Sequence, residues 1–224
     1  MRKVVIFGNN HFAEEVAYFV ETDGHDEVVA YTLDDEYVME DSFAEKELIP
    51  FSKLEQKYRK DEIEIIVAIG YNQMNTVRKA VTDKVKNSGW KIGQFIHSTA
   101  QIYDASIGEG NIIFDFTQIR HHTKIGDGNI VLANSIISHD CSIGDYNYFA
   151  GSVRILGCNK IGNFNFMGNS MIKTDSGTIG DMNLCAAGVV VNSDLESQML
   201  VTAEKCRVTK SNQRLMNIML MKQM

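Results

Sequence analysis

Five copies of one short motif, spaced eighteen residues apart, decide the fold of this chain. The first copy is Ile107-Gly108-Glu109-Gly110-Asn111, and the second is Ile125-Gly126-Asp127-Gly128-Asn129. The other three begin at Ile143, Ile161 and Ile179, and every copy has an asparagine four residues after its isoleucine. A register kept through five copies indicates a structural repeat.

A six-residue period runs between these copies. An apolar or sulfur-containing residue falls at every sixth position: Ile113, Ile119, Val131, Ile137, Phe149, Ile155, Met167, Cys185 and Val191. Lys173 breaks the rule, although Ile172 lies beside it. Neither a helix nor a single strand has a period of six, whereas a solenoid with three short strands per coil does. A β-sandwich, the main alternative, favours two-residue alternation instead.

The residues four positions after the apolar ones are small or short. They are Asn111, Thr117, Thr123, Ser135 and Cys141. We expect them to lie beside the inward side chains where the chain turns. Stacked coils would then pair their backbones in parallel ladders.

Residues 1–97 have a different pattern. Lys3–Phe7, Val28–Leu33 and Ile63–Ile69 are apolar, strand-sized runs. Helical spacing follows the first and third of them, as shown by Phe12, Val16, Phe19 and Val20, and then by Met74, Val77, Val81 and Val85. This order predicts a small parallel sheet covered by helices, a half-Rossmann unit.

Ligands of such sheets bind at the carboxyl ends of the strands. Polar and glycine residues lie there: Gly8, Asn9, Asn10 and His11 after the first strand, Asp34 and Asp35 after the second, and Gly70 after the third. The loop is not a GxGxxG motif and the segment is short, so a mononucleotide or nucleotide sugar fits better than NAD. The alternative is that Gly8 only makes the turn and Asp34 only caps the next segment.

Composition excludes several classes of function. The chain has 224 residues, with 22 Lys and Arg against 29 Asp and Glu, for a formal charge of −7, which disfavours nucleic acid as a partner. The longest apolar runs, such as Ile65–Ile69, are far shorter than the roughly 18 residues of a membrane span. No signal peptide is evident, and the four cysteines form no CxxC pair, so we expect a soluble cytoplasmic protein without disulfides or zinc.

Four segments carry a resemblance to a known family: Ile6–Gly8, Leu33–Asp35, Val67–Gly70 and Ile137–Cys141. The repeats resemble the left-handed β-helix (hexapeptide) acyltransferases. The whole chain resembles the bacterial sugar acyltransferases related to sialic acid O-acetyltransferases and to the N-acetyltransferases of UDP-4-amino sugars. The resemblance implies a nucleotide-sugar domain at 1–97, a left-handed β-helix for acyl-CoA at 98–195, and a tail with a short helix at 196–224. It also implies acetyl-CoA as co-substrate, a nucleotide-activated amino sugar as acceptor, and a homotrimer with active sites between subunits.

The resemblance assigns roles to individual residues. His139 matches the catalytic histidine and Asp140 the acidic residue after it. Gly8, Asn9, Asn10, His11, Asp34, Asp35 and Gly70 match the sugar-nucleotide site. Gly157, Asn169, Ala187 and Gly188 lie where the family's backbone touches the thioester and the pantetheine arm. Three segments depart from the family. Gly8–Phe12 reads Gly-Asn-Asn-His-Phe where the family commonly has Gly-x-x-Gly-His-Gly, and Tyr148 replaces a second histidine near the thioester. Val201–Lys205 replaces Gly-x-Pro-Ala-Lys at the final coenzyme contact, which includes Lys205.

The chemistry of acyl transfer explains these residue types. Histidine suits the general base because it titrates near neutral pH, and a carboxylate can fix its tautomer. Neighbours in an extended segment point apart, so Asp140 reaches the ring only if the chain bends there. We expect the backbone N–H of Gly157 to bind the oxyanion.

Other functions remain open at this stage. His121 lies one coil before His139, with His122 beside it, and stacked imidazoles hold metal in the γ-class carbonic anhydrases. The His-x4-His pair of those lyases is absent here, so we expect no metal. The remaining alternatives are sugar O-acetylation and ligand binding without catalysis. Basic residues in the tail, Lys205, Arg207, Lys210, Arg214 and Lys222, either bind the coenzyme phosphates or form a solvated face.

Overall fold

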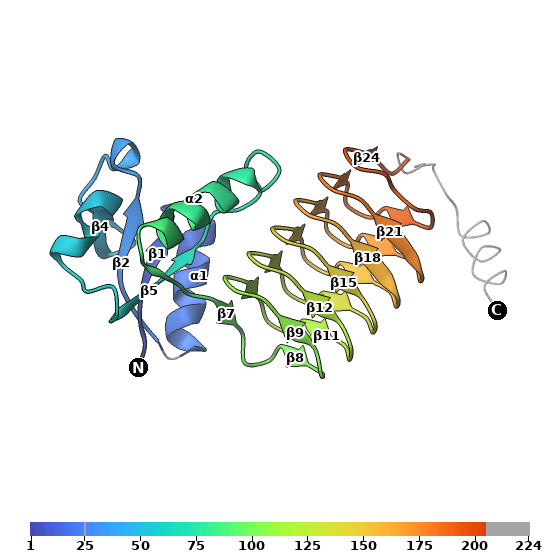
Figure 1. Ribbon diagram of the computed structural model, residues 1–224, viewed down its shortest axis with the longest axis horizontal. Helices are drawn as coiled ribbons and strands as arrows, with labels where there is room; N and C mark the ends of the chain where they lie inside the picture. Colours follow the sequence, from blue (N-terminus) through green and yellow to red (C-terminus); the bar gives the residue numbers. More distant parts are fainter. Residues whose placement is uncertain (25, 205–224) are drawn as a thin grey trace, which may run out of the picture.

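The computed structural model describes residues 1–24 and 26–204. Figure 1 shows two parts side by side: a front domain in which helices lie against a sheet, and a prism of stacked coils. Among the helices of the described residues, none has the length and apolar character needed to span a bilayer.

The front domain confirms the predicted parallel sheet. Its order is β3-β4-β2-β1-β5-β6, and β1 pairs in parallel with both neighbours. The bounds are β1 Lys3–Phe7, α1 His11–Thr22, β2 Glu27–Leu33, β3 Ser42–Phe43, β4 Lys46–Pro50, β5 Ile63–Val67, α2 Thr76–Asn87 and β6 Lys91–Ile92. Two short 3-10 helices, η1 Asp35–Tyr37 and η2 Phe51–Gln56, precede and follow the β3–β4 hairpin.

Two features of this domain differ from expectation. The sequence gives no periodic signal for β3 and β4, which extend the sheet beyond β2. The second helix was expected to include Met74, yet α2 begins at Thr76. Gln73, Met74 and Asn75 all have positive φ, at 47°, 52° and 67°, and that conformation cannot belong to a right-handed helix.

The repeats form a parallel β-helix with three sheets, as the eighteen-residue period predicts. The first prism sheet holds β7 Phe95–Ile96, β10 Ile112–Ile113, β13 Ile130–Val131, β16 Tyr148–Phe149, β19 Phe166–Met167, β22 Leu184–Cys185 and β24 Leu200–Val201. The second holds β8 Gln101–Ile102, β11 Gln118–Ile119, β14 Ile136–Ile137, β17 Arg154–Ile155, β20 Ile172–Lys173 and β23 Val190–Val191. The third holds β9 Ser106–Ile107, β12 Lys124–Ile125, β15 Ser142–Ile143, β18 Asn159–Ile161 and β21 Gly177–Ile179. The ladder starts at β7 and ends at β24, so it extends past residues 98 and 195 at both ends.

The inside of the prism is filled by the six-residue repeat. Ile113, Ile119, Ile137 and Phe149 are fully buried, and the small residues after them bond the next coil. Thr123, for example, donates through Oγ1 to the carbonyl oxygen of Ser138 at 2.6 Å. Because each coil supplies acceptors for the coil before it, the repeat fixes the register of the whole stack.

A buried arginine joins the two parts. Arg78 on α2 is only 1% exposed, and its Nε donates to the carbonyl oxygen of Gly128 at 2.9 Å. Its NH2 donates to the carbonyl oxygens of Tyr146 and Asn147, at 3.1 and 3.2 Å. Outward residues of the first prism sheet belong to the hydrophobic core of the front domain, so the two parts share one interior.

Candidate active site

His139 and Asp140 lie on the turn between β14 and β15, where the second prism sheet passes to the third. The turns that connect the second prism sheet to the third are stacked along the prism, and we call them the histidine edge. Asp140 has a positive φ of 55°, and this bend brings its side chain back to its neighbour. Nδ1 of His139 lies 2.8 Å from Oδ2 of Asp140. The bend that the pairing requires is therefore present.

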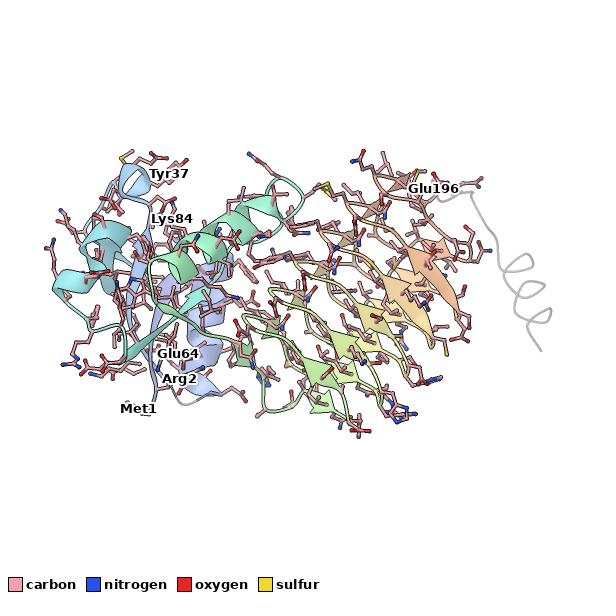
Figure 2. The ribbon with its side chains drawn as sticks, viewed as in Figure 1. Met1, Arg2, Tyr37, Glu64, Lys84 and Glu196 are labelled. Atoms are coloured by element: carbon pink, nitrogen blue, oxygen red, sulfur yellow. The ribbon has the colours of Figure 1, made fainter. Side chains whose placement is uncertain are left out.

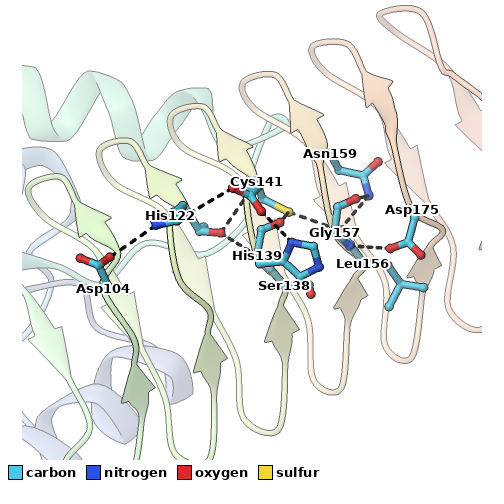
Figure 3. Close-up of polar contacts among 11 residues, drawn as sticks. Asp104, His122, Ser138, His139, Cys141, Leu156, Gly157, Asn159 and Asp175 are labelled. Atoms are coloured by element: carbon cyan, nitrogen blue, oxygen red, sulfur yellow. Dashed lines mark hydrogen bonds and ion pairs between the residues drawn. The ribbon is translucent and has the colours of Figure 1, made fainter.

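The carboxylate of Asp140 also faces a second histidine. Its Oδ1 lies 3.3 Å from Nδ1 of His122, and Nε2 of His122 lies 3.7 Å from Oδ2 of Asp104 (Figure 3). The hydrogen bond from His139, with a further one from His122, holds the pKa of Asp140 below its usual value. The carboxylate thus stays charged and can hold one tautomer of His139, leaving Nε2 to take a proton.

Gly157 lies one coil beyond His139, and the ring of His139 leaves no room for a side chain at this position. A Cβ at this position would lie 2.7 Å from both Cε1 and Nε2 of His139. Its N–H, however, already donates to Oδ1 of Asp175 at 2.6 Å. The expectation of a free oxyanion donor at Gly157 is therefore not met, because a carboxylate occupies it.

The two stacked histidines do not suit a shared metal ion. The rings of His121 and His139 are stacked, with centroids 5.5 Å apart and planes within 16° of parallel. Donor atoms of His121, His139 and Asp140 lie within 4.8 Å of one another. A metal binds an imidazole nitrogen in the plane of its ring, so two stacked rings cannot share an ion unless one of them turns. The geometry does not favour a metal-dependent lyase.

Residues assigned to the pantetheine arm lie on a different edge. Asn169, Ala187 and Gly188 occupy the turns between the first and second prism sheets, which we call the first–second edge, and all three are exposed. The N–H of Gly188 donates to the carbonyl oxygen of Asn169 at 2.8 Å. The second prism sheet separates this group from His139 within one chain.

Tyr148, which was expected near the thioester, is buried at the junction of the prism with the front domain. It lies on the outer face of the first prism sheet, only 7% exposed, with the ring of Tyr71 packed edge-on at 5.1 Å. Burial raises the pKa of Tyr148 to about 12. The residue belongs to the junction with the front domain, because that domain covers the face on which the ring projects.

A cleft of about 540 Å³ lies at the carboxyl ends of the front-domain strands. Gly8, Asn9, Asn10 and Asp34 line it, as the sequence predicts, together with Ile69 and Asn72 at the end of the third strand run. Tyr37 and Gln73 also line it, and the sequence analysis did not single them out. Gly8 has a φ of +149°, and a Cβ there would lie 2.8 Å from the carbonyl oxygen of Ala68. Oδ1 of Asn10 accepts from the N–H of Ala13 and so caps α1 beside the cleft.

The two predicted aspartates of the front domain both have partners within that domain. Asp34 does not cap η1; its Oδ1 lies 2.6 Å from Nζ of Lys84, which Figure 2 shows at the same end of the domain as Tyr37. Asp35 accepts hydrogen bonds from the N–H and hydroxyl of Ser52, at 3.2 and 2.5 Å.

Asp35, His11 and Gly70 are not among the residues that line the cleft. His11 is fully exposed beside Glu14, with 3.7 Å between Nδ1 and Oε2. The carbonyl oxygen of Gly70 accepts from NH1 of Arg78 at 2.5 Å. Gly70 therefore helps to hold α2 in place.

Both parts of the chain are similar to known proteins. Residues 3–85 match the PglD N-terminal domain, and residues 104–139 and 122–157 match the bacterial transferase hexapeptide family, described as six repeats. PerB from Caulobacter crescentus, solved with CoA and GDP-perosamine, is similar over 89% of this chain and 93% of its own, with 25% identity and a TM-score of 0.78. The chain therefore combines a PglD N-terminal domain with bacterial transferase hexapeptide repeats.

Two more solved structures share the fold of this chain. The acetyltransferase domain of PglB from Neisseria gonorrhoeae with acetyl coenzyme A is 22% identical, covers 89% of this chain and 95% of its own, and has a TM-score of 0.78. WeeI from Acinetobacter baumannii is 18% identical, covers 93% of this chain and 100% of its own, and has a TM-score of 0.64. No curated protein sequence matches the chain.

The structure shows contacts for two residues, His122 and Asp175, to which the sequence analysis gave no role. His122 lies eighteen residues before Asp140, and Asp175 lies eighteen residues after Gly157. The repeat period therefore held the signal that could have found both. Lys205, the basic residues of the tail, its expected helix and His25 lie outside the described residues.

Proposed function

We propose that this protein transfers the acetyl group of acetyl-CoA to the amine of a nucleotide-linked amino sugar, with His139 as general base. The observation that carries the proposal is the 2.8 Å contact between His139 Nδ1 and Asp140 Oδ2 on an exposed turn, where both side chains are 46% exposed. Support comes from PerB, whose structure contains CoA and GDP-perosamine. We choose the amine of an amino sugar as the acetyl acceptor because of this similarity to PerB.

The reaction would proceed through Nε2 of His139. This atom takes a proton from the sugar amine as its nitrogen attacks the thioester carbonyl carbon, and Asp140 stabilises the imidazolium that forms. The tetrahedral intermediate then collapses, the carbon–sulfur bond breaks, and the imidazolium returns a proton to the leaving thiolate. The products are an N-acetyl sugar and CoA with a free thiol.

The front-domain cleft is the proposed site for the nucleotide. It lies at the carboxyl ends of parallel strands, beside the start of α1, where backbone N–H groups and the helix dipole favour phosphate. Its volume of about 540 Å³ lies within the usual range for small-molecule sites. Asn9 and Asp34 offer hydrogen-bonding groups to phosphate oxygens and sugar hydroxyls.

The separation of two residue groups favours a site shared between copies. His139 lies on the histidine edge, whereas Asn169, Ala187 and Gly188 lie on the first–second edge. One extended coenzyme would contact both groups if the histidine edge of one copy faced the first–second edge of another. A closed ring of three copies, a homotrimer, repeats that contact without leaving an unpaired edge. We expect this enzyme to work in the cytoplasm, where acetyl-CoA is available.

The experiment is a free-thiol assay with acetyl-CoA and a panel of nucleotide-linked amino sugars, with each product analysed by mass spectrometry. The proposal predicts release of one thiol per acetyl group transferred, a product that resists hydroxylamine because it is an amide, and a rate unchanged by EDTA. A hydroxylamine-labile ester would indicate O-acetylation instead. No thiol release with any sugar would indicate a binding protein without turnover and would contradict the proposal.

A further inference from the structure

The acceptor of the Gly157 N–H is a carboxylate at the centre of the proposed site. Oδ1 of Asp175 lies 2.6 Å from that nitrogen, and a Cβ on the same glycine would lie 2.7 Å from Cε1 and Nε2 of His139. Figure 3 shows His139, Gly157 and Asp175 on successive coils of the histidine edge. The donor beside the general base is thus occupied by this chain's own side chain.

An N–H group makes one strong hydrogen bond. A thioester carbonyl that is attacked beside His139 needs a donor for the negative charge that develops on its oxygen. A carboxylate is a stronger acceptor than a neutral carbonyl oxygen, and its charge also repels a developing oxyanion. The thioester can therefore use this N–H only after the carboxylate of Asp175 has left it.

We propose that Asp175 is an internal competitor for the acyl carbonyl: its carboxylate occupies the Gly157 N–H in the free protein, and the acetyl group of the co-substrate displaces it. Asp175 is a positioning residue that controls access to the oxyanion donor. The side chain is exposed on its turn, so the displaced carboxylate enters water without crossing the protein interior. This inference rests on the proposed function.

The same type of bond elsewhere in the prism provides a matched control. On the turns between the third and first prism sheets, Oδ1 of Asp145 accepts from the N–H of Asp127 at 2.8 Å, and Oδ1 of Asp127 accepts from the N–H of Glu109 at 2.8 Å. These bonds also tie one coil to the next, but they lie on an edge without a histidine pair. Asp145→Ala thus removes an equivalent bond away from the proposed site.

The experiment measures the dissociation constants of acetyl-CoA and of CoA by titration calorimetry in the wild type, Asp175→Ala, Asp175→Asn and Asp145→Ala. CoA has no acyl carbonyl, so only acetyl-CoA should gain from a free N–H. We expect Asp175→Ala to bind acetyl-CoA about tenfold more tightly, the value of one charge-assisted hydrogen bond, with CoA binding unchanged. Asp175→Asn should also bind acetyl-CoA more tightly, but by a smaller factor. Asp145→Ala should change the dissociation constant of neither acetyl-CoA nor CoA.

Each other result has a defined meaning. Equal tightening of both coenzymes in Asp175→Ala would show that the carboxylate only repels a polyanion, and would overturn the proposal. Unchanged acetyl-CoA binding in both Asp175 variants would also overturn it. If Asp175→Ala does not fold, the test uses Asp175→Asn: the ratio of its dissociation constant for acetyl-CoA to that for CoA should be lower than in the wild type, and an unchanged ratio would overturn the proposal. A wild type that binds neither coenzyme contradicts the proposed function itself, and with it the competitor.

Discussion

Nε of Arg78 donates a hydrogen bond to the carbonyl oxygen of Gly128 over 2.9 Å and so fastens the front domain to the β-helix. Burial lowers the pKa of Arg78 to about 9, so the guanidinium is still charged at neutral pH. Its partners are backbone carbonyl oxygens and the Oδ1 of Asn75, none of them an ionised group. A cation held mainly by carbonyl dipoles fixes the angle between the two parts, because each carbonyl belongs to a rigid turn or strand end.

Replacing Arg78 by methionine should destabilise the protein by about 3 kcal/mol or more, because several buried carbonyl oxygens lose their donor at once. Urea unfolding followed by the fluorescence of Trp90, which is buried in the front domain, measures this. Lys79→Met is the control: Lys79 pairs with Asp83 on the exposed side of α2 and should change stability by less than about 0.5 kcal/mol. Equal stability of Arg78→Met and the wild type would refute the fastening role.

The pH profile should depend on Asp140. Its folded-state pKa is lowered, so its contribution to stability is present above about pH 4 and is lost as the pH falls further through the lowered value. Between pH 5 and 8 the carboxylate therefore stays charged and supports the imidazolium. In Asp140→Asn the acid limb of the kcat profile should move to lower pH, and kcat should fall about 100-fold. An unmoved limb in kcat measured from pH 5 to 9 would show that Asp140 does not act on His139.

The buried amine of Lys173 destabilises the folded prism. Its side chain is 1% exposed among inward apolar residues. Within residues 1–24 and 26–204, Nζ has one hydrogen bond, to the carbonyl oxygen of Thr174 at 3.4 Å. Lys173→Met keeps the unbranched stem and removes the buried amine, so it should stabilise the protein by on the order of 1–3 kcal/mol. Thermal unfolding checks this, with Lys124→Met on an exposed strand position as the control. A lower Tm for Lys173→Met than for the control would mean that the buried amine supports the last coils.

Of the cysteines in the described residues, Cys158 should react fastest with thiol reagents. It is exposed, and its N–H donates to the carbonyl oxygen of His139 at 3.0 Å, whereas Cys141 and Cys185 are buried. Burial raises the pKa of Cys185 to about 11 and also raises that of Cys141, so little thiolate forms at either. Peptide mapping after a short DTNB pulse should show the label at Cys158, with acetyl-CoA slowing it and Cys158→Ser removing it. Faster labelling of Cys141 or Cys185 would contradict the described interior.

Periodicity made the β-helix predictable in detail. The six-residue spacing identifies the inward positions, including Lys173, and the eighteen-residue spacing places His121 and His139 on one edge. Both are consequences of three strands per coil, a geometry that few sequences satisfy by accident. The paired His139 and Asp140 could be named from the sequence, but the bend that joins them depends on the positive φ of Asp140.

The remaining features depend on contacts between distant segments. Arg78 looks like a solvated residue on an amphipathic helix, because nothing local shows that backbone carbonyls of another domain will face it. Tyr148 is recognisable as an outward residue next to inward Phe149, but the front domain that covers it cannot be read from the repeat. Asp175 resembles any turn aspartate until the glycine one coil earlier is seen beside His139.

The most direct test of the account is the turnover of His139→Ala at saturating acetyl-CoA, with the preferred amino sugar from the panel. The account predicts a kcat about 10² to 10⁴ times lower than that of the wild type, with coenzyme binding retained, whereas His121→Ala should keep most of its activity. A His139→Ala protein that keeps most of its turnover would contradict the assignment of His139 as the general base.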